Sequence, residues 1–213
     1  ATSDAVGYSR MNTKFNNAGG WEASELRAKM NSGEIWNLMP SEFQSKVKSV
    51  RKLTNNVGGT DKNAAVTATS DKLFLLSYSE IVPTSYWASD YPWTSSEGTQ
   101  YEAFKGKVTE NYTSNPAIAI GYYWWERSAG PGDPYNFLGV DGEGAPSCYG
   151  SAAYSFCYSH LTTKPARGSR GPFSWRCLLI DACVVHTEMQ FGNMRQSIGN
   201  LRVKRNHNEL GAE

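Results

Sequence analysis

The first fifty residues carry apolar side chains at helical spacing. Residues 21–30 follow two glycines, contain mostly helix formers and place Leu26 and Met30 four positions apart. A second such segment begins at Ser41, directly after a proline, and its apolar residues are Phe43, Val47 and Val50. One apolar residue in every three or four positions forms a single face of a helix. We therefore expect two short amphipathic helices near the N-terminus.

The later segments predict strands that long loops separate. Residues 56–72 are rich in Asn, Gly, Thr, Asp and Lys and predict a loop, whereas residues 72–77 form an apolar run that predicts a buried strand. Residues 84–100 are aromatic and rich in turn formers, which is typical of an irregular, packed insertion. We expect further strands at residues 117–125, 137–140, 153–158, 175–180 and 182–185. Helices first and strands afterwards indicate an α+β fold, and nothing divides the single domain expected over residues 1–213.

Charge and motifs narrow the classes of function. The chain has 21 Lys and Arg against 20 Asp and Glu, so its net charge of +1 gives no field that would attract nucleic acid. No apolar run approaches the roughly 20 residues of a membrane-spanning helix. The N-terminus lacks the signal-peptide pattern, although an export signal that had been removed would leave secretion open. Nucleophile-elbow, HExxH, P-loop and dinucleotide motifs are not found, and we expect neither an enzyme nor a cofactor.

Aromatic residues concentrate in the second half of the chain. Residues 121–175 hold 12 of the 27 aromatic residues, together with many Ser and Gly, while Lys occurs there once, at Lys164. Tyr and Trp supply contact area at a low cost in side-chain entropy, and Ser and Gly adapt to a partner. This composition favours a binding surface, and the alternative is that glycine-rich loops need aromatic rings to pack on. Arg127 and Arg176 stand beside tryptophans and are expected to tie loops together, with ligand binding as the alternative.

The cysteines and the C-terminal segment leave several possibilities open. All four cysteines, Cys148, Cys157, Cys177 and Cys183, lie in the last third of the chain, where they allow three disulfide pairings or none. They do not alternate with the histidines at zinc-finger spacing, so we expect no metal. Residues 191–213 are basic and poor in apolar residues, which is typical of a solvated tail or an edge strand, with docking in a larger assembly as the alternative.

Four phrases in the sequence resemble a known family. Residues 19–31 read GGWEASELRAKMN, residues 71–77 read DKLFLLS with Glu80 after them, residues 97–101 read EGTQY, and residues 124–128 read WWERS. They resemble GGWxxSxLRxxLN, DKxFLLSxxE, EGxxY and WWLRS, the phrases of a C-type-lectin-like domain of bacterial and phage proteins. Two departures fall in the aromatic-rich region: Glu126 stands where the family has an apolar residue, and residues 174–177 read SWRC in place of a Val-Arg-Pro-Ala ending.

The resemblance implies a C-type-lectin-like fold with two short N-terminal helices, small antiparallel sheets and long loops. Such domains are similar to the formylglycine-generating-enzyme type of this fold, which also carries the variable proteins of diversity-generating retroelements. We therefore expect a display protein on a virion or cell surface that binds a protein or glycan through a variable region at about residues 121–180. The candidate ligand-binding residues are Glu126, Asp133, Tyr135, Tyr149, Tyr154, Tyr158, His160, Phe173 and Trp175.

Two other functions fit a lectin-like fold. A calcium-dependent sugar-binding lectin would need Glu-Pro-Asn or Gln-Pro-Asp with a downstream Trp-Asn-Asp, and these tripeptides are not found; residues 133–134 and 141–143 are common turn sequences. An oxidase of the formylglycine-generating kind would need a reactive cysteine pair, for which Cys177 and Cys183 are the candidates. Packing or a disulfide is the alternative role of these two cysteines.

Overall fold

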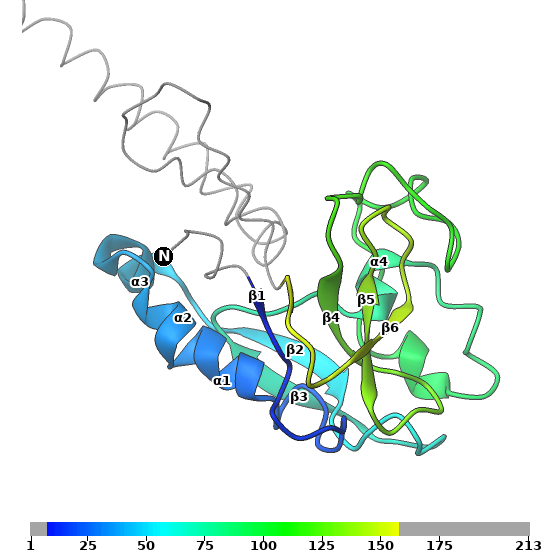
Figure 1. The fold of residues 1–213 in the computed structure, drawn as a ribbon, viewed down its shortest axis with the longest axis horizontal. Helices are drawn as coiled ribbons and strands as arrows, with labels where there is room; N and C mark the ends of the chain where they lie inside the picture. Colours follow the sequence, from blue (N-terminus) through cyan, green and yellow to red (C-terminus); the bar gives the residue numbers. More distant parts are fainter. Residues whose placement is uncertain (1–7, 158–213) are drawn as a thin grey trace, which may run out of the picture. The chain divides into compact units, whose positions relative to one another are not determined.

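The computed structural model describes residues 8–157, which form helical turns at the N-terminal end and two sheets (Figure 1). The helical elements are α1 (Glu25–Asn31), α2 (Glu34–Asn37), α3 (Ser41–Lys46), α4 (Tyr78–Ile81) and the 3-10 helix η2 (Pro92–Ser95). The strands are β1 (Tyr8–Ser9), β2 (Val50–Asn55), β3 (Val66–Asp71), β4 (Trp124–Ala129), β5 (Asn136–Val140), β6 (Cys148–Ser151) and β7 (Phe156–Cys157). The predicted α+β class is confirmed for these residues.

The strands form a five-stranded and a two-stranded sheet. The larger sheet has the order β1-β7-β4-β5-β6 and is antiparallel except for the β4–β7 pair, and β2 pairs antiparallel with β3 over its whole length. All six residues of β4 are buried, as expected for the central strand of a covered sheet. The strands predicted at residues 137–140 and 153–158 correspond to β5 and β7, and those predicted after residue 157 lie outside the described residues.

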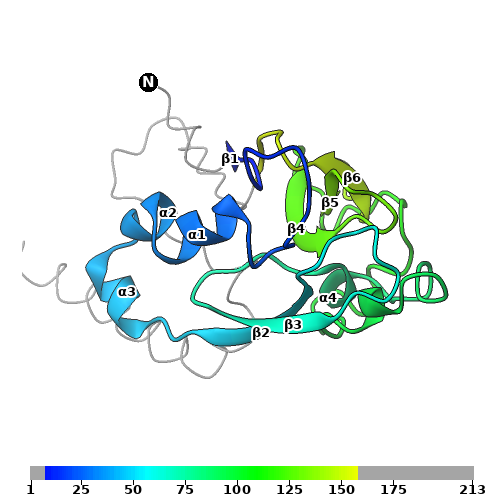
Figure 2. The ribbon, with the colours of Figure 1, turned by 90° about the horizontal axis from the view of Figure 1, so that it is seen from below.

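The first predicted helix is confirmed as α1, which the sequence specifies through its cap and its buried face. Ser24 is the N-cap, since its side chain accepts a hydrogen bond from the backbone N–H of Arg27, and Leu26 and Met30 point into the core. Gly19 and Gly20 both have positive φ, and a Cβ at Gly20 would clash with the backbone of Asn55. The two glycines therefore permit the close approach of this chain segment to β2, beside which α1 lies in Figures 1 and 2.

Side chains of residues 21–31 form hydrogen bonds and an ion pair with residues at the end of β3. Arg27 Nε lies 2.6 Å from Asp71 Oδ1, and the Trp21 indole donates a 3.0 Å hydrogen bond to Asp71 Oδ2. Asn31 accepts hydrogen bonds from the backbone N–H groups of Lys72 and Leu73 and donates one to the Leu73 carbonyl oxygen. The phrase at residues 19–31 therefore binds the phrase that begins at Asp71.

The strand prediction for residues 72–77 is wrong, although the prediction that they are buried is correct. Residues 73–77 are buried but do not form a strand. Asn31 binds Leu73, Arg127 Nη1 donates to the Leu75 carbonyl oxygen, and a single backbone bond, from the Arg127 N–H to the Leu76 carbonyl oxygen, joins the segment to β4. The apolar character of residues 73–77 thus reflects their burial and not pairing with another strand. The strand lies just before it, because residues 66–71 of the predicted loop form β3.

Two further predicted boundaries are corrected. The second predicted helix, α3, ends at Lys46, and Val50 begins β2 instead of completing the helical face. The strand predicted at residues 117–125 begins only at Trp124, because residues 116–118 form a turn closed by the hydrogen bond from Ala119 N–H to the Asn115 carbonyl oxygen. The core joins apolar side chains of the five-stranded sheet and of the helical segments, including Trp21, Leu26, Met30, Ile81, Trp125, Phe137 and Leu138.

Candidate ligand-binding surface

A fully buried arginine, Arg127, is the centre of a hydrogen-bond network that joins several segments of the described structure. Arg127 Nε donates to Thr54 Oγ1 (3.0 Å), and Nη1 lies 2.5 Å from Glu80 Oε2. The remaining N–H groups donate to the backbone carbonyl oxygens of Leu53, Leu75 and Glu97. A guanidinium group has five N–H donors, and here each has an acceptor. The expectation that Arg127 is a framework residue is confirmed, because its partners come from β2, α4 and two intervening segments.

Glu80 is the anionic partner of this arginine. Its other carboxylate oxygen lies 2.8 Å from Lys52 Nζ, and the Tyr101 hydroxyl donates to the same oxygen at 3.1 Å. Burial alone would raise the pKa of Glu80, but Arg127 and Lys52 outweigh it and lower the pKa to about 2. Glu80 is therefore ionised at neutral pH, and both its oxygens are engaged.

Glu97 completes the buried network on the other side of Arg127. The backbone N–H of Asn55 donates to Glu97 Oε1 at 2.8 Å, and the Ser128 hydroxyl donates to Oε2. Burial raises the pKa of Glu97 to about 7, although both hydrogen bonds oppose the rise. Three of the four phrases therefore meet at this buried network, through Glu80, through Glu97 and Tyr101, and through Arg127 and Ser128, while the first phrase binds the second through Arg27 and Asp71. Their polar groups bind one another, which is a structural role.

Four exposed or half-exposed aromatic rings form a continuous cluster, which we call the tyrosine surface: Tyr86, Trp87, Tyr112 and Tyr149. The Tyr86 ring lies 5.2 Å from that of Trp87 and 5.6 Å from that of Tyr112, between centroids. Trp87 lies 6.1 Å from both Tyr112 and Tyr149, and all four contacts are edge to face. This geometry is favourable for aromatic pairs and joins three segments that are distant in the sequence.

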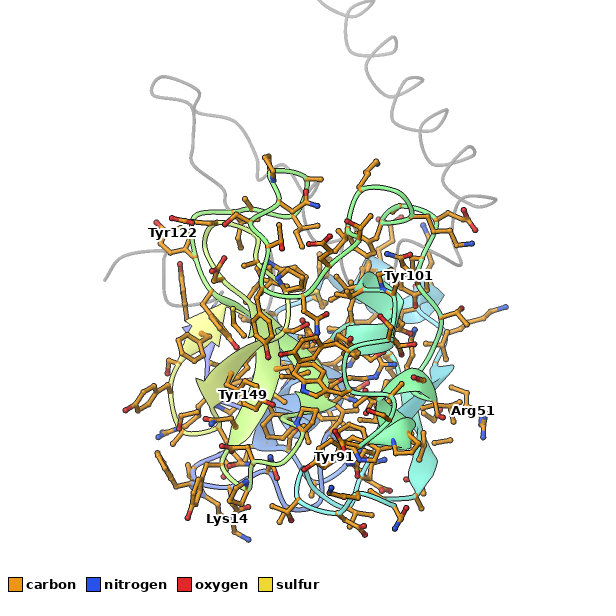
Figure 3. All side chains as sticks on the ribbon, turned by 90° about the vertical axis from the view of Figure 1, so that its right-hand side faces the viewer. Lys14, Arg51, Tyr91, Tyr101, Tyr122 and Tyr149 are labelled. Carbon is orange, nitrogen blue, oxygen red and sulfur yellow. The ribbon has the colours of Figure 1, made fainter. Side chains whose placement is uncertain are left out.

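The rings of the tyrosine surface reach solvent to different extents. Tyr86 is 61% exposed, Tyr112 45% and Tyr149 38%. Tyr149 is the most constrained of the three, because its hydroxyl donates a 2.8 Å hydrogen bond to the Pro131 carbonyl oxygen. Burial raises its pKa to about 12, so the phenol is neutral and can donate at physiological pH. Figure 3 shows Tyr149 near the middle of one face, with Tyr91 on the same side and Tyr122 at the margin.

The five predicted site residues that the structure describes do not form one patch. Tyr135 is half-exposed and contacts Phe15, with ring centroids 5.6 Å apart, whereas Tyr154 is 60% exposed and contacts Phe156. Asp133 is half-buried, and its carboxylate accepts hydrogen bonds from the backbone N–H groups of two following residues, as in an Asx turn. Only Tyr149 joins the tyrosine surface. Tyr158, His160, Phe173 and Trp175 lie outside the described residues, as does Arg176.

The position of the Glu126 side chain contradicts one expectation. It was predicted on an exposed patch, but its side chain is fully buried in β4. Burial raises its pKa to about 8, with a further rise from Glu97, while the backbone N–H of Ser147 opposes the rise. Glu126 therefore cannot contact a ligand at the surface of this structure.

The sequence did not predict three members of the tyrosine surface. Tyr86, Trp87 and Tyr112 precede residue 121, where the predicted binding region begins. Residues 84–100 were expected to be a packed aromatic insertion, and this is where Tyr86 and Trp87 lie. Their aromatic content was therefore the available signal, but their proximity to Tyr149 depends on the folded chain.

The described residues were also compared with what a metal site, a membrane span or a reactive thiol requires. Among residues 8–157, no group of three or more His, Cys, Asp and Glu side chains could hold a metal ion, and no helix is long and apolar enough to cross a membrane. Cys148 is a free thiol whose pKa burial raises to about 11, so it is protonated at neutral pH and a poor nucleophile. Cys177 and Cys183 lie outside the described residues.

A comparison with known families finds a match over most of the chain. Residues 2–166 match the family described as a domain of unknown function, DUF6273. The chain belongs to this family. The match includes all four phrases and all members of the tyrosine surface, so both lie within the DUF6273 domain. No match was found among the curated proteins or among the solved structures.

Proposed function

We propose that this protein binds another macromolecule through the tyrosine surface and does not transform it chemically. The observation that carries the proposal is the convergence of Tyr86, Trp87, Tyr112 and Tyr149 from three separate segments into one partly exposed ring cluster. Large exposed aromatic clusters mark interaction sites, because Tyr and Trp bury much area while few torsions become ordered. In the buried network of Arg127, by contrast, the carboxylate oxygens of Glu80 and Glu97 are already hydrogen-bonded within the network.

A protein surface is the partner that these observations favour. The rings contact one another edge to face at centroid separations of 5.2 to 6.1 Å, so the edge of one ring covers part of the face of its neighbour, on which a sugar would otherwise stack. Their exposed edges and hydroxyl groups instead present a broad area that combines apolar contact with hydrogen bonding. Tyrosine-rich combining surfaces of this kind suit protein recognition. Binding to a glycan is the alternative outcome of the test below.

We extend the proposal to the kind of scaffold. The order of the four phrases supports a C-type-lectin-like domain of the formylglycine-generating-enzyme type, used as a variable protein of a diversity-generating retroelement. A frame that satisfies its own polar groups suits such use, because exposed side chains can then change at little cost in folding. In the coding DNA, a reverse transcriptase gene beside a near-copy of the segment for residues 121–180, differing at adenines, is the expected finding.

The binding proposal is tested with the full chain as bait against a phage-displayed peptide library and an array of glycans. We expect selected peptides to bind, and Tyr86→Ala, Tyr112→Ala and Tyr149→Ala each to weaken their binding by about tenfold or more. Tyr122→Ala is the matched control, because Tyr122 is 52% exposed but contacts Tyr8 and not the tyrosine surface.

The outcomes separate the alternatives. Glycan binding that the same three substitutions weaken would keep the surface and replace the partner. Ligands whose affinity responds to Tyr122→Ala and to none of the three would show that the binding site lies elsewhere.

A further inference from the structure

A buried carboxyl group in β4 has no hydrogen-bond partner among the described residues. Glu126 is fully buried, and within residues 8–157 neither of its carboxylate oxygens is hydrogen-bonded. The buried Ser147 hydroxyl and the Asn111 side-chain N–H₂ group are also unpartnered. Buried polar groups are nearly always bonded in folded proteins, so an unpartnered set in one place needs an explanation.

The three residues lie where two loops meet. The backbone N–H of Tyr112 donates a 3.0 Å hydrogen bond to the Pro146 carbonyl oxygen, which joins the loop of Asn111 to the loop of Ser147. The Tyr78 hydroxyl donates to Asn111 Oδ1 at 3.2 Å, and the Ser147 backbone N–H faces the Glu126 carboxyl group. One loop carries Tyr112 itself, and the other leads directly into Tyr149.

Backbone strain is concentrated at the same place. Tyr112 has φ 57° and Ser147 has φ 71°, and within residues 8–157 they are the only residues other than glycine with positive φ. This left-handed conformation is unfavourable for residues with a Cβ and persists only where the surroundings hold it. Strained residues of this kind are often found in segments that switch between two conformations.

Burial favours the neutral form of Glu126. Among the titratable groups around it, Glu97 opposes a negative charge on Glu126, whereas Tyr78 in α4, Tyr123 before β4 and Cys148 in β6 are themselves neutral at physiological pH and bring no charge to it. Within residues 8–157, Arg127 is the one cation that acts on Glu126, and its five donors are already bound to Glu80 and to other acceptors. An ionised Glu126 would therefore be a buried charge without a cationic partner of its own.

We propose that Glu126 is a proton-dependent switch: its neutral form permits the loops of Tyr112 and Ser147 to close, and loss of the proton to solvent opens them and disorders the tyrosine surface. The consequence for ligand binding, which weakens as the pH rises, rests on the proposed function. The opening of the loops does not, because it can be measured without a ligand.

The direction of the pH dependence follows from the two states. In an open loop Glu126 regains the ordinary pKa of 4.5, whereas burial raises it to about 8 in the closed state. Between these values the closed state holds one more proton than the open state, so the open fraction rises by about tenfold per pH unit. Above about pH 8 both states are ionised and the open fraction levels off.

Amide hydrogen exchange of the full chain between pH 5.5 and 7.5 tests this switch, after correction for the intrinsic dependence of exchange on pH. We expect the protection of the Tyr112 amide, which is bonded to Pro146, to fall by about tenfold per pH unit, while amides of α1 keep theirs. In Glu126→Gln, whose side chain is neutral at every pH, Tyr112 should keep constant protection. Glu126→Met is a second neutral variant should the first not fold.

Two results would overturn the switch: protection of Tyr112 that is independent of pH in the wild type, or the same pH dependence in the neutral variants. Glu97→Gln is the control for the other buried acid and should leave the dependence unchanged. A pH-dependent Tyr112 amide together with alanine variants that bind normally would instead sink the binding proposal and leave the switch intact.

Discussion

At the scale of single residues, the roles of Arg127 and Glu126 differ although both are buried next to each other in β4. All five N–H donors of Arg127 have acceptors, whereas neither carboxylate oxygen of Glu126 has a donor. A fully paired buried charge specifies the arrangement of the segments around it, while an unpaired polar group costs free energy. Of these two neighbouring residues of β4, Arg127 therefore stabilises the fold, whereas Glu126 is the residue to which we assign the pH-dependent switch.

Replacing Arg127 with lysine should strongly destabilise the protein. Lysine keeps the positive charge but cannot reproduce the five-donor fork, so buried carbonyl oxygens of β2 and of the segment before α4 lose their partners. We expect Arg127→Lys to lower the free energy of unfolding by about 3 kcal/mol or more, measured by urea denaturation.

Arg51→Lys is the control for this substitution, because Arg51 lies exposed in β2 (Figure 3). It should change the free energy of unfolding by less than about 0.5 kcal/mol. Equal effects of the two substitutions would contradict the role assigned to Arg127.

At the scale of elements, side chains often replace secondary-structure pairing. Residues 73–77 are buried but do not form a strand, and Asn31 at the end of α1 binds the backbone where this segment begins. The helix and the segment after β3 are thereby connected over 42 positions of sequence. Such a connection lets a chain rich in loops keep its buried backbone groups satisfied.

Asn31→Ala should therefore destabilise the protein although Asn31 is only half-buried. The substitution removes hydrogen bonds to Lys72 and Leu73, and we expect a loss of about 2 kcal/mol in the free energy of unfolding. Asn37→Ala, at an exposed position in α2, should cost less than about 0.5 kcal/mol in the same urea titration. A loss at Asn31 no larger than that at Asn37 would show that these hydrogen bonds contribute little.

The sequence predicts these elements unevenly, for physical reasons. α1 was predictable because its cap, its glycines and its apolar spacing all act locally. β3 was missed because its Thr and Ser residues are also common in loops, and the pairing with β2 that stabilises it is a tertiary contact. The apolar run at residues 73–77 was misread because hydrophobicity reports burial and does not distinguish a strand from a segment held by side chains.

At the scale of the whole described domain, the structure separates a frame held by the Arg127 network from an exposed tyrosine surface. The sequence predicted the frame through its four phrases and the role of Arg127, but it predicted only Tyr149 of the surface. Tyr86 and Tyr112 contact each other across 26 positions, and burial of Glu126 depends on the strands around β4, so no local pattern reveals either. Long-range proximity is what the sequence alone could not supply.

The separation of surface from frame is tested most directly by the free energy of unfolding of the Tyr86→Ala/Tyr112→Ala double variant, compared with Trp125→Ala. Tyr86 and Tyr112 are largely exposed, so we predict that the double variant loses less than about 2 kcal/mol, whereas the buried Trp125 should cost about 3 to 5 kcal/mol when truncated. A double variant that loses as much as Trp125→Ala would contradict the account, because the rings of the tyrosine surface would then belong to the core.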